Sequence, residues 1–182
     1  GGRLTLGVGA GWQVREHENF SFDLLNEKER FERFEEGLQI ITHLLQKDEP
    51  LTFNGSYYKL SNAVLLPRPA RPGGPPILIG GNGVKRTLPL AARYADEWNA
   101  VYIPSETFRE RNDLLTKMIT AEKRDPLKIR RSMMNGLVFA RTEKELQEKL
   151  QARDLNRLKS AGVIVGTPDQ LASQFDDFAA AG

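Results

Sequence analysis

The stretch "PPILIGGNGVKRTLPLAARYADEWNA" (residues 75–100) decides the fold class of this chain. Its pattern predicts a short apolar strand at 76–80, a glycine-rich turn, a helix at about 84–95 and a second strand at 97–103. Apolar strands that alternate with helices are typical of parallel sheets. The stretch therefore predicts an α/β fold.

The same alternation continues on both sides of this stretch. Upstream, "RLTLGVG" (3–9) predicts a buried strand, and regularly spaced apolar residues predict a helix at about 27–46 that Asn26 caps. Further segments are predicted downstream: a helix at about 105–123, a strand at about 130–140, a helix at about 142–160 and a final helix from Thr167-Pro168. Two architectures fit, a doubly wound sheet or part of a (β/α)8 barrel. A whole barrel takes about 250 residues, so these strands would make about half of one.

Residues 47–76 interrupt the alternation. An Asn54-Gly55 turn lies between β-prone flanks and predicts a hairpin, and five prolines between Pro67 and Pro76 predict an extended, irregular path. We treat 1–182 as one incomplete domain, in which residues 47–76 depart from the strand–helix alternation.

The glycine-rich turn after the strand at 76–80 is the first candidate site. It consists of Gly80, Gly81, Asn82 and Gly83. Glycines there allow a tight turn, but they also let backbone N–H groups approach a phosphate at a helix N-terminus. Lys85 and Arg86 in the first helical turn would help to hold such an anion and are unfavourable to the helix without one.

A second glycine motif, "GVGAGW" (7–12), follows the first strand. A dinucleotide-binding Rossmann fingerprint would need a third glycine where this chain has Trp12, and a second strand near residue 30, where the pattern is helical. The Rossmann interpretation is kept only as an alternative. His17, in the polar segment after this motif, is a weak candidate for a catalytic residue.

Composition limits the class of protein. The chain of 182 residues has a net charge of +2, which argues against nucleic acid as the main partner. No apolar run approaches the ~18 residues of a membrane span, and without cysteine there is no thiolate metal site. We expect no metal and a cytoplasmic location. Because the chain begins with Gly1 and a strand-like run follows at once, we also expect it to be a piece of a longer protein.

Taken in order, "LGVGAGW", "ERFERFEEGLQII", "NGSYYKL", "PPILIGGNG", "LAARYADEWN" and "GTPDQLA" resemble the luciferase-like flavin or deazaflavin oxidoreductases. The resemblance spans nearly the whole chain and implies a (β/α)8 TIM barrel with an excursion after the fourth strand. Residues 3–9 would then be the fourth strand. Residues 76–80, 97–103 and about 130–140 would be the fifth to seventh strands.

The resemblance also implies a cofactor site, in which Gly80, Gly81, Asn82 and Gly83 hold the phosphate of the cofactor side chain with help from Arg86. Gly9 and Ala10 would line the pocket near the ring system, and Trp12 would lie against ring or substrate. Glu97 departs from the family pattern, which commonly has glycine there. The strands that commonly carry the acid or base residue are absent, so no catalytic residue is carried over.

The implied activity is that of an oxidoreductase on a small organic substrate. The cofactor would be deazaflavin coenzyme F-420 for hydride transfer, which the motifs favour, or FMN for monooxygenation. Dimers are common in the family, so a homodimer is one expected assembly. The alternative from another class is a catalytically inert half-barrel or interaction module.

Overall fold

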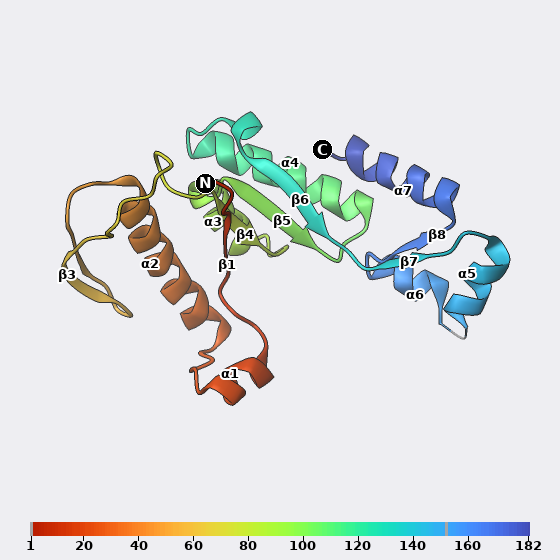
Figure 1. Ribbon diagram of the computed structural model, residues 1–182, viewed down its shortest axis with the longest axis horizontal. Coiled ribbons are helices and arrows are strands. Elements are labelled where there is room, and N and C mark those ends of the chain that lie inside the picture. Colours follow the sequence, from red (N-terminus) through yellow and green to blue (C-terminus); the bar gives the residue numbers. More distant parts are fainter. Residues whose placement is uncertain (1, 152) are drawn as a thin grey trace. The chain divides into compact units, whose positions relative to one another are not determined.

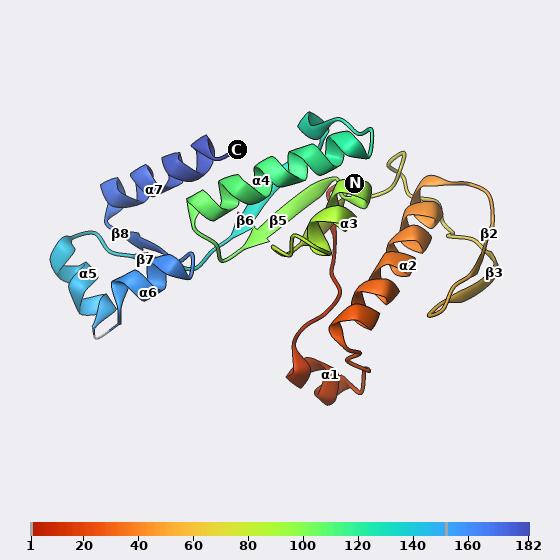
Figure 2. The same ribbon diagram turned by 180° about the vertical axis from the view of Figure 1, so that it is seen from behind.

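The computed structural model describes residues 2–151 and 153–182, and these form two compact units (Figures 1 and 2). The first unit runs up to Ile79 and includes Tyr94–Asp96. The second comprises Gly80–Arg93 and Glu97–Gly182. Each unit is described by itself.

In the first unit, strand β1 (Leu6–Val8) pairs in parallel with β4 (Ile77–Gly80), with Leu6 opposite Ile77 and Val8 opposite Ile79. Helix α2 (Glu27–Gln46) has the predicted bounds, and the Asn26 side chain accepts a hydrogen bond from Glu29 N at 3.0 Å. Helix α1 (Val14–Phe20) was not predicted. None of its residues is buried, so it has no apolar periodicity that a sequence pattern could reveal.

The predicted hairpin is confirmed as β2 (Leu51–Asn54) and β3 (Lys59–Ala63), and no helix or strand follows over 64–76. Its turn is fixed to α2 by Glu36, whose carboxylate accepts hydrogen bonds from the backbone N–H groups of Ser56 (2.8 Å), Tyr57 (3.0 Å) and Tyr58 (3.1 Å). A single carboxylate therefore satisfies three consecutive donors of the turn.

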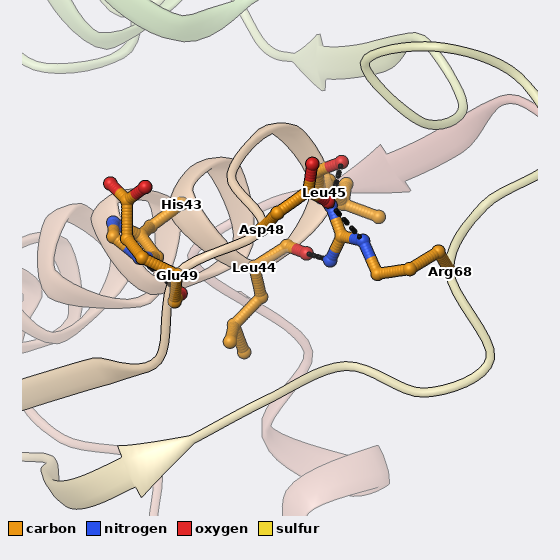
Figure 3. A network of polar contacts seen from close by, with 6 residues as sticks. All are labelled: His43, Leu44, Leu45, Asp48, Glu49 and Arg68. Atoms are coloured by element: carbon orange, nitrogen blue, oxygen red, sulfur yellow. Dashed lines mark hydrogen bonds and ion pairs between the residues drawn. The ribbon is translucent and has the colours of Figure 1, made fainter.

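The C-terminal end of α2 is closed by Arg68 from the proline-rich segment (Figure 3). Its guanidinium donates to the carbonyl oxygens of Leu44 (2.7 Å) and Leu45 (3.3 Å), and its Nε lies 2.9 Å from Asp48 Oδ1. The last carbonyls of a helix lack partners within the helix, so this side chain satisfies two of them.

The second unit is built on β5 (Glu97–Val101) and β6 (Arg130–Met134), which pair in parallel from Glu97–Arg130 to Val101–Met134. Helix α4 (Ser105–Ala121) runs alongside this pair in both views (Figures 1 and 2). Trp98 is fully buried and stacks on Phe108 of α4, with ring centroids 5.4 Å apart. This contact anchors the strand that faces the glycine-rich turn. Helix α3 (Thr87–Tyr94) and the short 3-10 turn η1 (Pro126–Lys128) complete this part.

The remainder of the second unit differs from the prediction in two places. The single strand predicted at 130–140 ends at Met134 and restarts as β7 (Leu137–Phe139), which pairs with an unpredicted strand β8 (Ile164–Gly166). The break falls at Asn135-Gly136, and it divides the segment between two different sheets. Three buried residues give β8 no alternation to detect.

The helix predicted at 142–160 is also two helices, α5 (Glu143–Leu150) and α6 (Leu155–Ser160). Gln151 ends the first helix at a positive φ of 49°, and Asp154 begins the second by accepting hydrogen bonds from Asn156 N and Arg157 N. The final helix is confirmed as α7 (Pro168–Ala180), with a capping box between Thr167 and Gln170. In the described ranges, no helix has the length and apolar character that crossing a membrane requires.

Candidate functional site

The turn "GGNG" begins at Gly80, the last residue of β4, and is held by β5 at several points. Gly81 N donates to Asn99 O at 2.9 Å, and Gly81 O accepts from the indole Nε1 of Trp98 at 2.8 Å. Gly81 has φ +120°, a backbone conformation that residues other than glycine rarely adopt. Because Trp98 is itself stacked and buried, the turn is fixed to a rigid part of the core.

Asn82 extends this attachment with its side chain. Its Nδ2 donates to Val101 O at 2.6 Å, and its Oδ1 accepts from Val101 N at 3.0 Å. The carboxamide thus pairs with the end of β5 as a further strand residue would. Both polar atoms of the Asn82 side chain are therefore occupied by Val101. If Asn82 contacts a cofactor as predicted, its backbone N–H makes the contact.

The backbone after Asn82 carries unpaired donors. In residues 2–151 and 153–182, the N–H groups of Asn82, Gly83 and Val84 make no hydrogen bond. Helix α3 begins at Thr87, not at 84 as predicted, because Leu88 N bonds to Gly83 O and residues 84–86 form a turn. Three consecutive free donors at a rigid, partly exposed turn can bind an anion.

The basic residues beside this turn are placed differently. Lys85 is exposed, whereas Arg86 is half-buried and already interacts within the chain. Thr87 is buried, and its Oγ1 lies 3.0 Å from the position that a Cβ on Gly83 would take. Glycine at this position therefore keeps the turn open above Thr87.

The residues predicted near the cofactor ring belong to the first unit. Gly9 and Ala10 line a cavity of about 730 Å³ next to the end of β1. Trp12 is 77% exposed and does not line this cavity. The predicted single site combines residues of both units, so each group is described here separately and their assembly stays a prediction.

Two side chains hold the segment that follows Ala10. Arg30 Nη1 donates to Gly11 O, and His17 Nδ1 lies 2.8 Å from Gln13 O. Gly11 has φ +78°, and a Cβ there would lie 3.0 Å from His17 Nε2. His17 thus packs against its own loop, which is a structural role. Arg30 was not among the predicted site residues, because its spacing suits an ordinary helix surface.

Glu97, noted as a departure from the family pattern, is only 8% exposed and has two partners. Ser132 Oγ donates to its Oε1 at 2.5 Å, and Arg130 Nη1 lies 3.2 Å from its Oε2. Asn99 Nδ2 in turn donates to Ser132 Oγ at 2.8 Å. A buried carboxylate is tolerated here because the neighbouring strand supplies a cation and a hydroxyl.

The described residues contain no group of three or more His, Cys, Asp or Glu side chains that could hold a metal ion. The arrangement can bind and orient a phosphate-bearing molecule, but within the described ranges it shows no acid–base pair that would mark a catalytic centre.

The fold is an α/β fold that matches part of solved TIM barrels. A solved F420-dependent secondary alcohol dehydrogenase, in complex with an F420-acetone adduct, matches all of this chain with a TM-score of 0.81. The match covers 62% of that chain at 20% sequence identity. The likeness confirms the predicted partial TIM barrel as the fold class.

The chain belongs to the luciferase-like monooxygenase family, whose model matches residues 1–161. It is 41% identical over 95 residues to an F420-dependent glucose-6-phosphate dehydrogenase from Nakamurella multipartita, covering 52% of this chain and 26% of that protein. It is 28% identical over 96 residues to an FMNH(2)-dependent dimethylsulfone monooxygenase from Pseudomonas putida, covering 53% of this chain and 26% of that protein. The matches thus span about a quarter of the length of these curated relatives.

Proposed function

We propose that this chain is part of an oxidoreductase that binds deazaflavin coenzyme F-420 and passes hydride between its ring and a small organic substrate. FMN-dependent monooxygenation is the second candidate, because the similar proteins include both F420-dependent dehydrogenases and an FMNH(2)-dependent monooxygenase. We place the protein in the cytoplasm and treat 1–182 as one incomplete barrel domain.

The turn Gly80–Gly83 carries this proposal. Its unpaired N–H groups at 82–84 fit a phosphate, and Trp98 and Asn82 keep them in place before any ligand arrives. Donors that are already fixed bind an anion without a further loss of conformational entropy. Glycine at 83 leaves the approach open, and Lys85 adds a positive charge at the edge.

In this proposal the chain binds and orients the cofactor, which supplies hydride chemistry as a deazaflavin or oxygen chemistry as reduced FMN. The turn with Arg86 holds the phosphate end, and Gly9 and Ala10 contact the ring end. Trp12 covers the ring or the substrate. We assign no proton-transfer role to any residue of this chain. Homodimerisation is kept as an expected assembly.

The test is a parallel fluorescence titration of the whole gene product with F-420, FMN and riboflavin. Riboflavin lacks the phosphate of FMN and is otherwise the same molecule. If the turn binds phosphate through three charge-assisted hydrogen bonds, FMN should bind about 100-fold more tightly than riboflavin. The Lys85→Ala variant should reduce this ratio, whereas Lys117→Ala, an exposed lysine on α4, should leave it unchanged.

Tighter binding of F-420 than of FMN would support the hydride-transfer proposal, and the reverse would support monooxygenation. Equal affinity for FMN and riboflavin would contradict the phosphate role of the turn. If neither cofactor bound, the proposed activity would be wrong, and the inert-module alternative would take its place.

A further inference from the structure

The cavity of about 730 Å³ beside β1 is lined by both charged and apolar side chains, and their arrangement indicates which kind of molecule can bind there. Its volume lies within the ~300–1,000 Å³ that is usual for small-molecule sites. Five of its residues come from one face of α2, namely Arg30, Arg33, Phe34, Gly37 and Ile41. Counted from Arg30, they stand at i, i+3, i+4, i+7 and i+11, which places them in a row along one face of the helix.

This row changes character along its length. The two arginines lie toward the N-terminal end of α2, near His17 and Asp23, which also line the cavity. Phe34 follows directly after Arg33, and Gly37 and Ile41 lie further toward the C-terminal end of α2. There the Tyr58 ring lies 3.8 Å from the position that a Cβ on Gly37 would take. The cavity therefore has a cationic end and an apolar end.

The two guanidiniums are not neutralised by the helix that carries them. Although α2 is rich in glutamate, Glu36 is engaged by the hairpin turn and Glu32 by Lys28 and Tyr57. In the described part of the chain, neither arginine forms an ion pair. Asp23 is the only residue with a carboxylate among the lining residues. Arg33 Nη2 lies 3.5 Å from the backbone carbonyl oxygen of Asp23.

Arg30 also has one N–H donor without a hydrogen-bond partner. Its Nη1 is used by Gly11 O, but its buried Nε has no hydrogen-bond partner. A half-buried cation with an unsatisfied donor is costly unless an acceptor is supplied. Two guanidiniums side by side are also well suited to the oxygens of a carboxylate or phosphate.

We infer that this cavity binds an organic anion, with its carboxylate or phosphate at Arg30 and Arg33 and its apolar body between Phe34, Gly37 and Ile41. In the framework of the proposed function, on which this assignment rests, that anion is the substrate. The substrate class is thus an organic anion, a carboxylate or a phosphate ester, with an aromatic or aliphatic body. Gly37 is the residue that leaves room for the body.

The test is calorimetric titration of the whole gene product, without cofactor, with phenyl phosphate and benzoate as probes. Benzyl alcohol lacks the charge and inorganic phosphate lacks the body, so both should bind at least about tenfold more weakly than phenyl phosphate. Arg33→Gln should weaken phenyl phosphate at least about tenfold. Arg15→Gln, an exposed arginine of α1, should have no effect.

A second pair of variants tests the apolar end. Gly37→Leu should fill the cavity and weaken phenyl phosphate, while inorganic phosphate is unaffected. Gln39→Leu, at an exposed position of the same helix, serves as the control. Equal binding of phenyl phosphate to wild type, Arg33→Gln and Gly37→Leu would overturn the inference, and so would the absence of binding by any probe.

The same variants distinguish whether the anion bound in the cavity is the substrate or the phosphate of the cofactor. If Arg33→Gln weakened FMN but not riboflavin, the anion would be the cofactor phosphate and the substrate assignment would be wrong. If wild type bound phenyl phosphate but no cofactor, the proposed function would fail while the anion site remained. If cofactors bound and the organic anions did not, only this inference would fail.

Discussion

The side chain of Asn82 pairs with both backbone groups of Val101, donating to its carbonyl oxygen at 2.6 Å and accepting from its N–H at 3.0 Å. One carboxamide thereby joins the glycine-rich turn after β4 to the last residue of β5. A residue that the sequence marks as a ligand contact is thus also a structural link. The free donors at 82–84 depend on this link for their position.

Asn82→Ala should lower the free energy of unfolding by about 1–3 kcal/mol, because both backbone groups of Val101 lose their partner. Chemical denaturation measures this effect. In the same variant, FMN should lose more affinity than riboflavin, since the turn that we propose to hold the phosphate is released. Asn156→Ala, an exposed asparagine in the same unit, is the control. Unchanged stability and affinity would show that the side-chain pairing has no energetic role.

Gly37→Ala should stabilise the chain. Gly37 lies inside α2, where glycine costs about 0.5–1 kcal/mol relative to alanine. An added Cβ would meet only the ring of Tyr58, at an ordinary contact distance of 3.8 Å. We expect Tm to rise by about 1–4 °C in a thermal melt. A fall in Tm would mean that the contact with Tyr58 is tighter than the structure indicates.

Arg68→Ala should destabilise the first unit by about 1–3 kcal/mol, because the carbonyls of Leu44 and Leu45 lose their donor (Figure 3). Asp48→Asn should change stability by less than about 0.5 kcal/mol, since the Asp48 side chain is 93% exposed and its ion pair is screened by water. Comparing the two denaturation curves separates the roles of Arg68. Equal losses would assign the effect to the ion pair instead of the helix end.

The hairpin turn should weaken in acid. Partial burial raises the pKa of the Glu36 carboxylate. The hydrogen bonds from the backbone N–H groups of Tyr57, Ser56 and Tyr58 lower it by more than burial raises it, so the pKa lies below the ordinary 4.5. A lowered folded-state pKa means that this stabilisation is present above pH 4.5 and is lost as pH falls through the folded-state pKa.

Unfolding measured from pH 7 to pH 3 tests this expectation. Wild type should lose more stability over this range than Glu36→Gln, which has no carboxylate to protonate. Glu16→Gln, at an exposed position of α1, should follow wild type. Identical pH profiles for wild type and Glu36→Gln would contradict the proposed role of the three hydrogen bonds.

Local patterns predicted several elements closely. Asn26 and the apolar spacing after it located α2 with its observed bounds, Asn54-Gly55 located the hairpin and Thr167-Pro168 located α7. In each case, the residues that end or begin the element act on their own backbone neighbours. Elements without such a signal were missed, namely the unburied helix α1 and the fully buried strand β8.

The predicted site residues divide in the same way. The order of the glycine motifs marked the turn at Gly80–Gly83, because φ +120° at Gly81 is a local requirement that the residue type reveals. The sequence could not reveal that Asn82 pairs with Val101, that Glu97 has Ser132 and Arg130 as partners, or that Arg30 reaches Gly11. These partners lie 19 to 35 residues apart along the chain.

The sequence by itself thus determined the α/β class and the position of the glycine-rich turn, since these follow from residue type and short-range spacing, and its motifs resembled those of the family. The tertiary structure decided which donors of that turn remain free and that, among the described residues, two arginines of α2 share a cavity without forming an ion pair. The physical reason is that hydrogen bonds and charge neutralisation depend on which groups meet in space. A pattern along one segment does not contain the positions of the groups that meet it.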